Sequence, residues 1–171
     1  VRPSNWPLAA IPCRRRCGDG SGQDRPTIEV RNMSADIFIP ARTSGHGQFT
    51  VDIDHEKAGW GYSGLRVVEL EAGASQALET GDSELLVLPL AGSATVNVDG
   101  RDYELAGRPG VFQAVTDYLY VGRGKELTIT SAAGGRFAFP SAVATKDLPT
   151  AYYPKETVRI DLRGAGDCSR Q

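Results

Sequence analysis

The chain has 171 residues, of which 40% are hydrophobic and 23% are charged, and its formal net charge at pH 7 is −2. This is the composition of one ordinary globular domain with a modest core. The small net charge gives no electrostatic reason to expect a nucleic acid or an anionic membrane as partner, and no apolar run approaches the ~18 residues of a membrane span. We therefore expect a cytosolic, cytoplasmic protein.

Residues 1–32 differ in composition from the rest of the chain. They contain six Arg, three acidic residues and four of the ten prolines, and they show no sustained strand or helix period. Such a segment has little to bury, so we interpret it as a disordered or non-native N-terminal extension. Met33, the only methionine, is the expected start of the protein, and a basic tail that binds a partner is the alternative interpretation.

From Met33 onward the sequence has the pattern of a β protein. Apolar and polar residues alternate over short runs that end at Gly, Asp-Gly or Gly-Arg-Gly, and no segment forms a convincing amphipathic helix. Short strands at near-regular spacing predict an all-β sandwich or barrel. The expected strands cover residues 48–54, 65–73, 84–92, 94–100, 102–107, 110–115, 118–122, 126–132 and 136–142.

The stretch TGDSELLVLPLAGSATVNVDG, residues 80–100, is the most informative part of this pattern. It predicts a strand, a tight turn at Gly92, a second strand and a hairpin at Asp99-Gly100, where a type I′ turn needs positive φ. This cadence is similar to the first motif of a cupin barrel. The expected fold is therefore an all-β, cupin-type jelly-roll barrel (RmlC-like).

Three segments give the chain a resemblance to a known family. They are AGWGYSGLRVVELEAGASQALETGDSELLVLPLAGSATVNVDG, VFQAVTDYLYVGRG and the C-terminal LRGAGDCSRQ. In this order they resemble the amino-terminal half of the 5-deoxy-glucuronate isomerases, the bicupin isomerases of myo-inositol catabolism. The resemblance covers residues 33–171, and it depends on the ordered series of motifs rather than on any one of them.

The resemblance implies two cupin barrels in a full-length chain. Residues 33–145 would form the N-terminal barrel. Residues 146–171 would hold a strand, expected over 157–162, and the start of the interdomain linker, with the second barrel absent. The resemblance also implies a divalent metal, Zn or Mn, held by three His and one Glu of the second barrel, so we expect this chain to bind no cofactor. The expected partners are a sugar-acid substrate of the full-length enzyme and the second barrel, in cis or in trans, and a homo-oligomer is left open.

The activity that the resemblance implies is the aldose–ketose isomerisation of 5-deoxy-D-glucuronate to 5-dehydro-2-deoxy-D-gluconate. This reaction moves hydrogen between C1 and C2, with an electrophile at the carbonyl oxygen and a base for the proton. Because one fold hosts many unrelated activities, a second hypothesis stands beside it. The chain would then be a non-catalytic cupin module, either a scaffold half or a small sugar-acid binder.

A metal site within this chain is not expected. The two histidines, His46 and His55, fall in predicted loops, and the three cysteines do not complete a zinc site. Residues 78–81 stand where the first cupin motif usually carries its histidines. No residue is therefore assigned as catalytic, cofactor-binding or metal-ligating.

Several other side chains have both a functional and a structural interpretation. Tyr118 and Tyr120 stand where a third histidine of a cupin could lie and share one strand face; they could line the barrel mouth, but half-buried core aromatics are the favoured interpretation. Glu84 is near the expected Glu position, yet one carboxylate without imidazoles is a poor metal site. Asp52 and Asp54 share a strand face that we expect to be solvated.

Two further groups of large side chains could have a functional role, and we favour a structural interpretation of both. Trp60 and Tyr62 are expected to pack in an apolar corner beneath the first barrel strand. Arg66, Arg101 and Arg136 lie on or beside predicted strands, and we expect them to face solvent because burying an unpaired guanidinium is costly.

Overall fold

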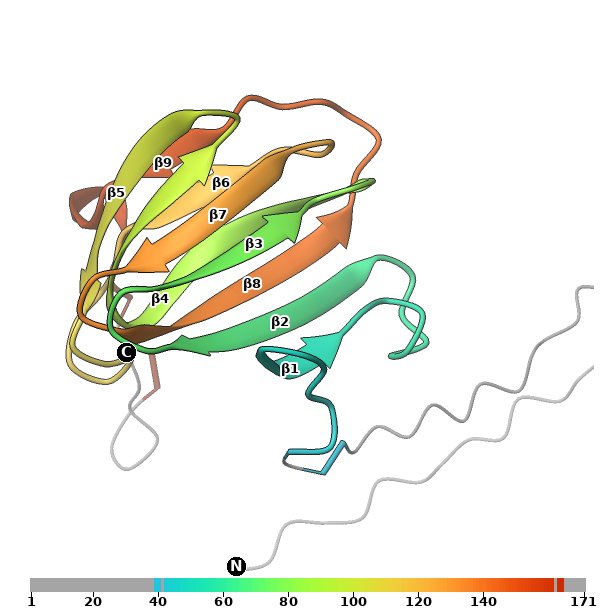
Figure 1. Cartoon of the computed structure of the whole chain (residues 1–171), viewed down its shortest axis with the longest axis horizontal. Helices are drawn as coiled ribbons and strands as arrows, with labels where there is room; N and C mark the ends of the chain where they lie inside the picture. The colour runs from blue at the N-terminus through green and yellow to red at the C-terminus, as the bar shows by residue number, and fades with distance from the viewer. Residues whose placement is uncertain (1–38, 41, 162, 165–171) are drawn as a thin grey trace, which may run out of the picture. The chain divides into compact units, whose positions relative to one another are not determined.

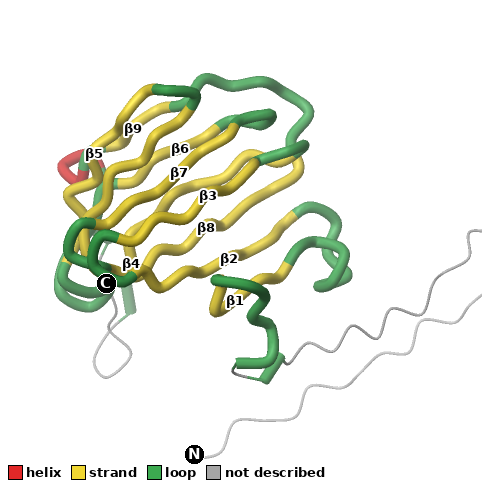
Figure 2. Tube along the Cα trace, in the orientation of Figure 1, coloured by secondary structure: helices red, strands yellow, loops and turns green. Residues whose placement is uncertain are grey.

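The computed structural model describes residues 39–40, 42–161 and 163–164. The predictions for residues 1–32, for the cysteines and for the end of the linker lie outside these residues. The described part is almost entirely strand and loop, with one short helical turn (Figure 2). No helix within it is long and apolar enough to cross a membrane.

The strands follow one another along the chain with short connections, as Figure 1 shows. They are β1 (Phe49–Ile53), β2 (Ser63–Leu70), β3 (Ala74–Glu79), β4 (Ser83–Val98), β5 (Arg101–Arg108), β6 (Tyr118–Val121), β7 (Glu126–Ser131), β8 (Gly135–Val143) and β9 (Ala151–Tyr153), followed by the 3-10 helix η1 (Lys155–Thr157).

All the pairings between these strands are antiparallel, and they form two ladders that share β4. The first has the order β1-β2-β8-β4-β6-β9, and in the second β3 pairs with β7, β7 with β4, and β4 with β5. Alternate residues of both ladders point into one apolar core, which contains Val68, Val87, Val96, Ile129 and Phe137. The core therefore lies between the two ladders.

The long strand β4 passes from one ladder to the other. Its first half pairs with β6 and β8, and its second half pairs with β5 and β7. The register shifts on both sides of Gly92, whose φ is +90°. The prediction of a tight turn at Gly92 is therefore wrong: the glycine bends one continuous strand, because a bulge with positive φ turns a strand without ending it.

The glycine at this bend has no room for a side chain. A Cβ on Gly92 would lie 2.7 Å from the carbonyl oxygen of Gly134, and a Cβ on Gly107 would overlap the carbonyl oxygen of Gly92. Three backbone segments thus meet at the bend in direct contact.

The hairpin prediction at Asp99-Gly100 is confirmed. Both residues have positive φ, 49° and 83°, and Val98 pairs with Arg101 across the two-residue loop. The side-chain oxygen of Asn97 also accepts a hydrogen bond of 3.1 Å from the backbone N–H of Gly100. The local turn chemistry was sufficient to identify this hairpin.

Two expected strands are absent from the described residues, and two observed strands, β3 and β9, were not expected. Residues 110–115 form a turn rather than a strand, and the strand β3 was not expected. The strand expected over 157–162 is also not formed over 157–161, where the chain leaves η1 without regular structure; β9 pairs with β6 instead. Short runs of this kind take their structure from the neighbour available for pairing, which the pattern does not contain.

We predict that the bend at Gly92 depends on the absence of a side chain. Gly92→Ala should lower the free energy of unfolding by about 3 kcal/mol or more, since it adds backbone strain and a contact with Gly134. Gly100→Ala is the matched control, because Gly100 has a similar φ but no atom within 4 Å of the added Cβ; it should cost about 1 kcal/mol. Equal losses in urea unfolding would contradict the importance of the close contact.

Candidate functional site

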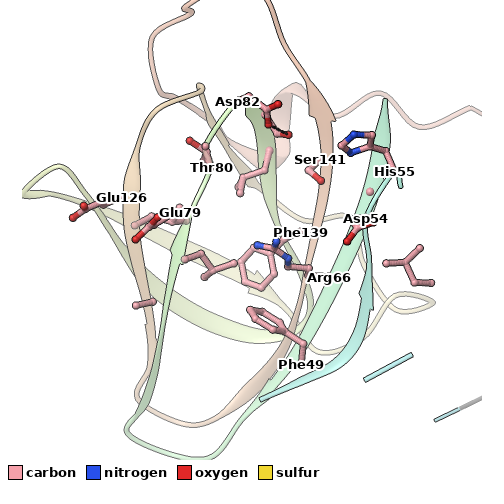
Figure 3. A pocket seen from close by; sticks show the side chains of 18 of the residues that line it. Phe49, Asp54, His55, Arg66, Glu79, Thr80, Asp82, Glu126, Phe139 and Ser141 are labelled. Carbon is pink, nitrogen blue, oxygen red and sulfur yellow. Dashed lines mark hydrogen bonds between the residues drawn. The ribbon is translucent and has the colours of Figure 1, made fainter. Parts of the chain in front are cut away.

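A cavity of about 670 Å³ opens between the two ladders (Figure 3). Its apolar lining comes from β1, β3, β4, β7 and β8, through Phe49, Leu78, Leu85, Leu127 and Phe139. A concave apolar surface with a few polar groups is the usual form of a small-molecule site. This cavity is therefore the candidate functional site.

The turn between β3 and β4 forms one rim of the cavity and is fixed to the turn before β7. Thr80 is buried, and its hydroxyl accepts a hydrogen bond of 2.8 Å from the backbone N–H of Lys125. The Thr80 backbone N–H also donates to the carbonyl oxygen of Lys125, at 2.9 Å, and Gly124 donates to Gly81 at 2.8 Å. These bonds hold Asp82 at the rim, where Figure 3 shows it.

Polar side chains from β2, from β8 and from the turn after β1 lie on the other wall. Figure 3 shows Arg66 next to the ring of Phe139, with Asp54, His55 and Ser141 nearby. The backbone N–H of Lys57 donates a hydrogen bond of 2.7 Å to Asp54 and lowers the pKa of that carboxyl. Asp54 therefore stays ionised at neutral pH.

The structure corrects the prediction for one of the three strand arginines. Arg66 is opposite Phe139 in the β2–β8 register, and Phe139 belongs to the core, so Arg66 lies on the inner face and lines the cavity, although its side chain remains 42% exposed. Arg101 and Arg136 are exposed, as predicted. The alternation of β2 alone could have placed Arg66 on the same face as Val68.

Asp52 is less solvated than the sequence suggested. Its side chain is 13% exposed and accepts a hydrogen bond of 3.2 Å from the Nε of Arg66. Its second carboxylate oxygen lies 3.8 Å from Lys57 Nζ and 3.8 Å from His46 Nδ1. Asp52 therefore serves as the anchor of Arg66 and not as a free acid or base.

Tyr118 and Tyr120 do not line the cavity. Leu119 and Val121, which alternate with them, belong to the core, so both tyrosines point to the outer face of the first ladder. The Tyr120 hydroxyl donates a hydrogen bond of 2.6 Å to Glu84, and burial together with this bond raises the pKa of Tyr120 to about 12. The phenol stays protonated at neutral pH and is not a base for the cavity.

Two aromatic residues are more exposed than expected. Trp60 and Tyr62 are 57% and 69% exposed, so they do not pack in an apolar corner.

Tyr118 has an aromatic partner in β9, since its ring stacks on that of Tyr153 at 4.9 Å between centroids. This contact was invisible in the sequence because β9 was not expected.

The described residues do not fit a metal centre of the cupin kind. His55 lies at the cavity, whereas His46 lies at the surface with its side chain 84% exposed. No three His, Cys, Asp or Glu side chains gather within the described ranges in a way that could hold an ion. A site with an open coordination position needs three protein ligands, and the described side chains supply no such set.

One buried carboxylate was missed by the sequence analysis. Asp117 is 1% exposed and accepts hydrogen bonds from the backbone N–H groups of Ala106, at 2.7 Å, and Gly107, at 2.9 Å. The hydroxyls of Thr116, at 3.2 Å, and Tyr152, at 2.8 Å, also donate to it. Burial raises the pKa of Asp117, but these four bonds together outweigh burial and hold the pKa below its ordinary value.

The four bonds give Asp117 a structural role. They join the end of β5, the start of β6 and the strand β9, and they leave the carboxylate no exposed face for a ligand. The Tyr152 hydroxyl uses its proton in the bond to Asp117. Burial and this bond raise the pKa of Tyr152 to about 12, so the phenol stays protonated at neutral pH.

The comparison with known proteins gives one family. A model described as the KduI/IolB family matches residues 37–171. A 5-deoxy-glucuronate isomerase of Geobacillus kaustophilus (strain HTA426) is 27% identical over 137 residues, which are 79% of this chain and 50% of that protein. One of Listeria monocytogenes serotype 4b (strain CLIP80459) is 29% identical over 119 residues, or 68% of this chain and 44% of that protein. The chain spans about half the length of these curated relatives.

A solved structure has the same fold. The crystal structure of an IolB-like protein from Salmonella typhimurium LT2 matches with a TM-score of 0.68 and 25% identity, over 74% of this chain and 49% of that chain. The expected all-β, cupin-type fold is thereby confirmed, although the two ladders do not close into a complete barrel.

We predict that Asp117 stabilises the fold through its charge. Asp117→Asn should lower the free energy of unfolding at pH 7 by about 2–4 kcal/mol, because the amide cannot accept all four hydrogen bonds. Asp99→Asn, which removes an exposed carboxylate paired with Lys125 at 2.7 Å, is the control and should cost much less.

The lowered pKa of Asp117 predicts that its contribution to the free energy of unfolding depends on pH. The pKa of Asp117 is lower in the folded than in the unfolded chain, so its contribution is fully present above the unfolded value, about 4, and is lost as the pH falls through the folded value. The stability difference between the wild type and Asp117→Asn should therefore shrink below about pH 4. Urea midpoints measured from pH 7 to pH 2 test this, and a difference that grows on acidification would contradict it.

Another prediction concerns the metal content of the chain. After dialysis the 171-residue chain should retain no stoichiometric Zn, Mn, Fe or Ni, since the described residues present no set of three ligands. Elemental analysis is the measurement. About one metal ion per chain, lost on replacing His46 or His55, would contradict our placement of the metal centre outside this part of the protein.

Proposed function

Because this chain belongs to the KduI/IolB family, we propose that it is one cupin barrel of an aldose–ketose isomerase acting on 5-deoxy-D-glucuronate. The observation that carries the proposal is the family match over residues 37–171, which joins the chain to relatives named 5-deoxy-glucuronate isomerase. The reaction would belong to myo-inositol catabolism in the cytoplasm.

The proposed isomerisation requires an electrophile that the cavity residues do not supply. Moving hydrogen between C1 and C2 of a sugar needs an electrophile at the carbonyl oxygen and a base at carbon. The cavity offers the guanidinium of Arg66, which can donate hydrogen bonds, and the carboxylate of Asp54, which is held by the Lys57 backbone. These groups can orient a substrate, but they provide no strong electrophile.

This deficit fits a chain that acts as the N-terminal portion of a longer enzyme. The relatives are about twice as long as the part that matches this chain, so the remaining half is available to carry the electrophile. In the proposal, the described barrel supplies a folded scaffold and a polar cavity, and the other half supplies a divalent metal that polarises the carbonyl.

The alternative proposal is a non-catalytic module that binds a small sugar acid. The cavity favours it, because it combines apolar walls with one guanidinium and several hydroxyl and carboxylate groups. The two proposals differ in whether isomerisation appears when a second barrel is present.

We predict that the chain alone does not turn over 5-deoxy-D-glucuronate, with or without added divalent metal. Without a strong electrophile the rate should be lower by several orders of magnitude, at ~1.4 kcal/mol per tenfold. Joining the second half of the Geobacillus relative to this chain, or co-expressing it, should give metal-dependent turnover. NMR of the sugar acid measures both.

The outcomes separate the two proposals. Turnover only with the second half supports the isomerase. Metal-independent turnover by the chain alone would contradict the expected division of roles, and no turnover in either form, with both halves folded by circular dichroism, would favour the non-catalytic module.

A further inference from the structure

The outer faces of the two ladders differ in chemistry. Directly opposed residues of antiparallel strands point to the same side, so the residues that alternate with the core side chains form the outer face of each ladder. On the second ladder this face is polar. The hydroxyls of Ser75 and Thr130 share a hydrogen bond of 2.8 Å, and the Thr95 hydroxyl donates to the carboxylate of Glu104 at 3.0 Å. Such a face is stable in contact with water.

The outer face of the first ladder is apolar instead. Val67 and Ala138 are opposite each other in the β2–β8 register and are 5% exposed, yet neither belongs to the core cluster between the ladders. They lie on the outer side, where side chains of β2, β8, β4, β6 and β9 continue the apolar surface. We call this surface the apolar face, and its other main members are Leu65, Leu86, Leu88, Tyr118, Pro140 and Tyr153.

The apolar face has the extent of a small protein–protein contact. It crosses the neighbouring strands β2, β8, β4, β6 and β9 and follows β8 from Arg136 to Ala142, so it measures about 20 Å by about 20 Å. Leu86 and Leu88 in its middle are half-buried, and Tyr153 at its edge is 41% exposed. Monomeric proteins rarely leave contiguous apolar patches of several hundred Å² in water, and such patches mark interaction surfaces.

The charged groups of this face lie at its two ends. Arg136 and Glu69 are opposite each other at one end, with Arg136 Nε 3.3 Å from the Glu69 carboxylate. Glu84 lies at the other end, opposite Ala142, and accepts a hydrogen bond of 2.6 Å from the Tyr120 hydroxyl. One end therefore carries a guanidinium, and the other carries a carboxylate whose donor is uncharged.

This arrangement is complementary to itself. A two-fold axis that lies in the contact plane, perpendicular to the strands, places each end of one copy against the opposite end of the other. Arg136 of each copy then meets Glu84 of the other, while the two apolar middles pack together. Burial of the apolar middles supplies the favourable free energy, and the opposite charges at the ends set the orientation.

We propose that the apolar face is the interface of a two-fold dimer, and that its occupant is a second copy of this chain. The polar outer face of the second ladder stays in water in this dimer. Because the apolar face is small, the dimer dissociates in the micromolar range. The proposal rests on the chemistry of the two outer faces and requires neither isomerase activity nor a ligand.

The test is the mass of the 171-residue chain in solution, measured by sedimentation velocity from about 1 µM to about 200 µM. The mass should rise with concentration from that of one chain to that of two. A single-chain mass over the whole range would overturn the proposal. A mass that grows beyond two chains would also overturn it, because a two-fold contact is closed by two copies.

Two matched substitutions locate the contact. Leu86→Lys places two charges in the middle of the interface, one from each copy, and should weaken dimerisation about a hundredfold or more. Thr128→Lys is the control, since Thr128 is exposed in the middle of the polar outer face, opposite Ala77 and Asn97. It should dimerise as the wild type does. Equal effects of the two substitutions, with both variants folded by circular dichroism, would overturn the assignment of the face.

A measurement on the unsubstituted chain keeps the test decisive if Leu86→Lys does not fold. In hydroxyl-radical footprinting, oxidation of Tyr153 should fall as the concentration rises through the dimerisation midpoint. Tyr62 is the internal control, since it is 69% exposed and lines the cavity rather than the apolar face. Its oxidation should stay constant. An unchanged oxidation rate at Tyr153 would overturn the proposal.

Charge reversal tests the orientation of the two copies. Arg136→Glu should weaken dimerisation about tenfold, because carboxylates then meet at both ends, and adding Glu84→Arg should restore it. A folded double variant that is not restored would overturn the pairing of opposite ends.

The two-half protein identifies a different occupant. If that protein is a monomer in which Tyr153 is protected from oxidation, the second half covers the apolar face, and a second copy as the occupant is overturned. This readout uses no turnover, so absence of isomerase activity would refute the proposed function and leave the dimer standing.

Discussion

The fold depends on the bend of one strand at a residue that has no side chain. β4 pairs with β6 and β8 before Gly92 and with β5 and β7 after it, so a single strand holds both ladders around one core. The bend is possible because Gly92 adopts φ +90° and the backbones of Gly134 and Gly107 approach it directly. The cavity lies between the two ladders that β4 joins, and residues of β4 form part of its lining.

Two charged side chains of this fold differ in how many of their hydrogen-bonding atoms have a partner. Asp117 is buried, and four donors from three segments surround its carboxylate, so it has no capacity left for a ligand. Arg66 has one acceptor among the described residues and stands in a cavity. Burial with full hydrogen bonding marks Asp117 as a structural group, whereas Arg66 keeps donors that its described neighbours do not use.

The proposed division of chemistry between two halves starts from the same contrast between Asp117 and Arg66. Isomerisation of a sugar needs a strong electrophile as well as groups that bind and orient. The described cavity has polar groups in its lining but no set of three metal ligands, and the chain matches about half the length of relatives that carry the isomerase name. In the proposed two-barrel enzyme, the strong electrophile would therefore belong to the half that this chain does not match.

The sequence by itself determined the all-β class, the family resemblance and the Asp99-Gly100 hairpin, because alternation and turn chemistry are local properties. The tertiary structure decided which face each strand buries. It placed Arg66 in the cavity and Tyr120 outside it, and it joined two expected strands at Gly92. It also collected the donors around Asp117 from residues up to 35 positions away. Face and partner depend on register and on bulges, which are set by contacts between distant segments and are not encoded in a one-dimensional pattern.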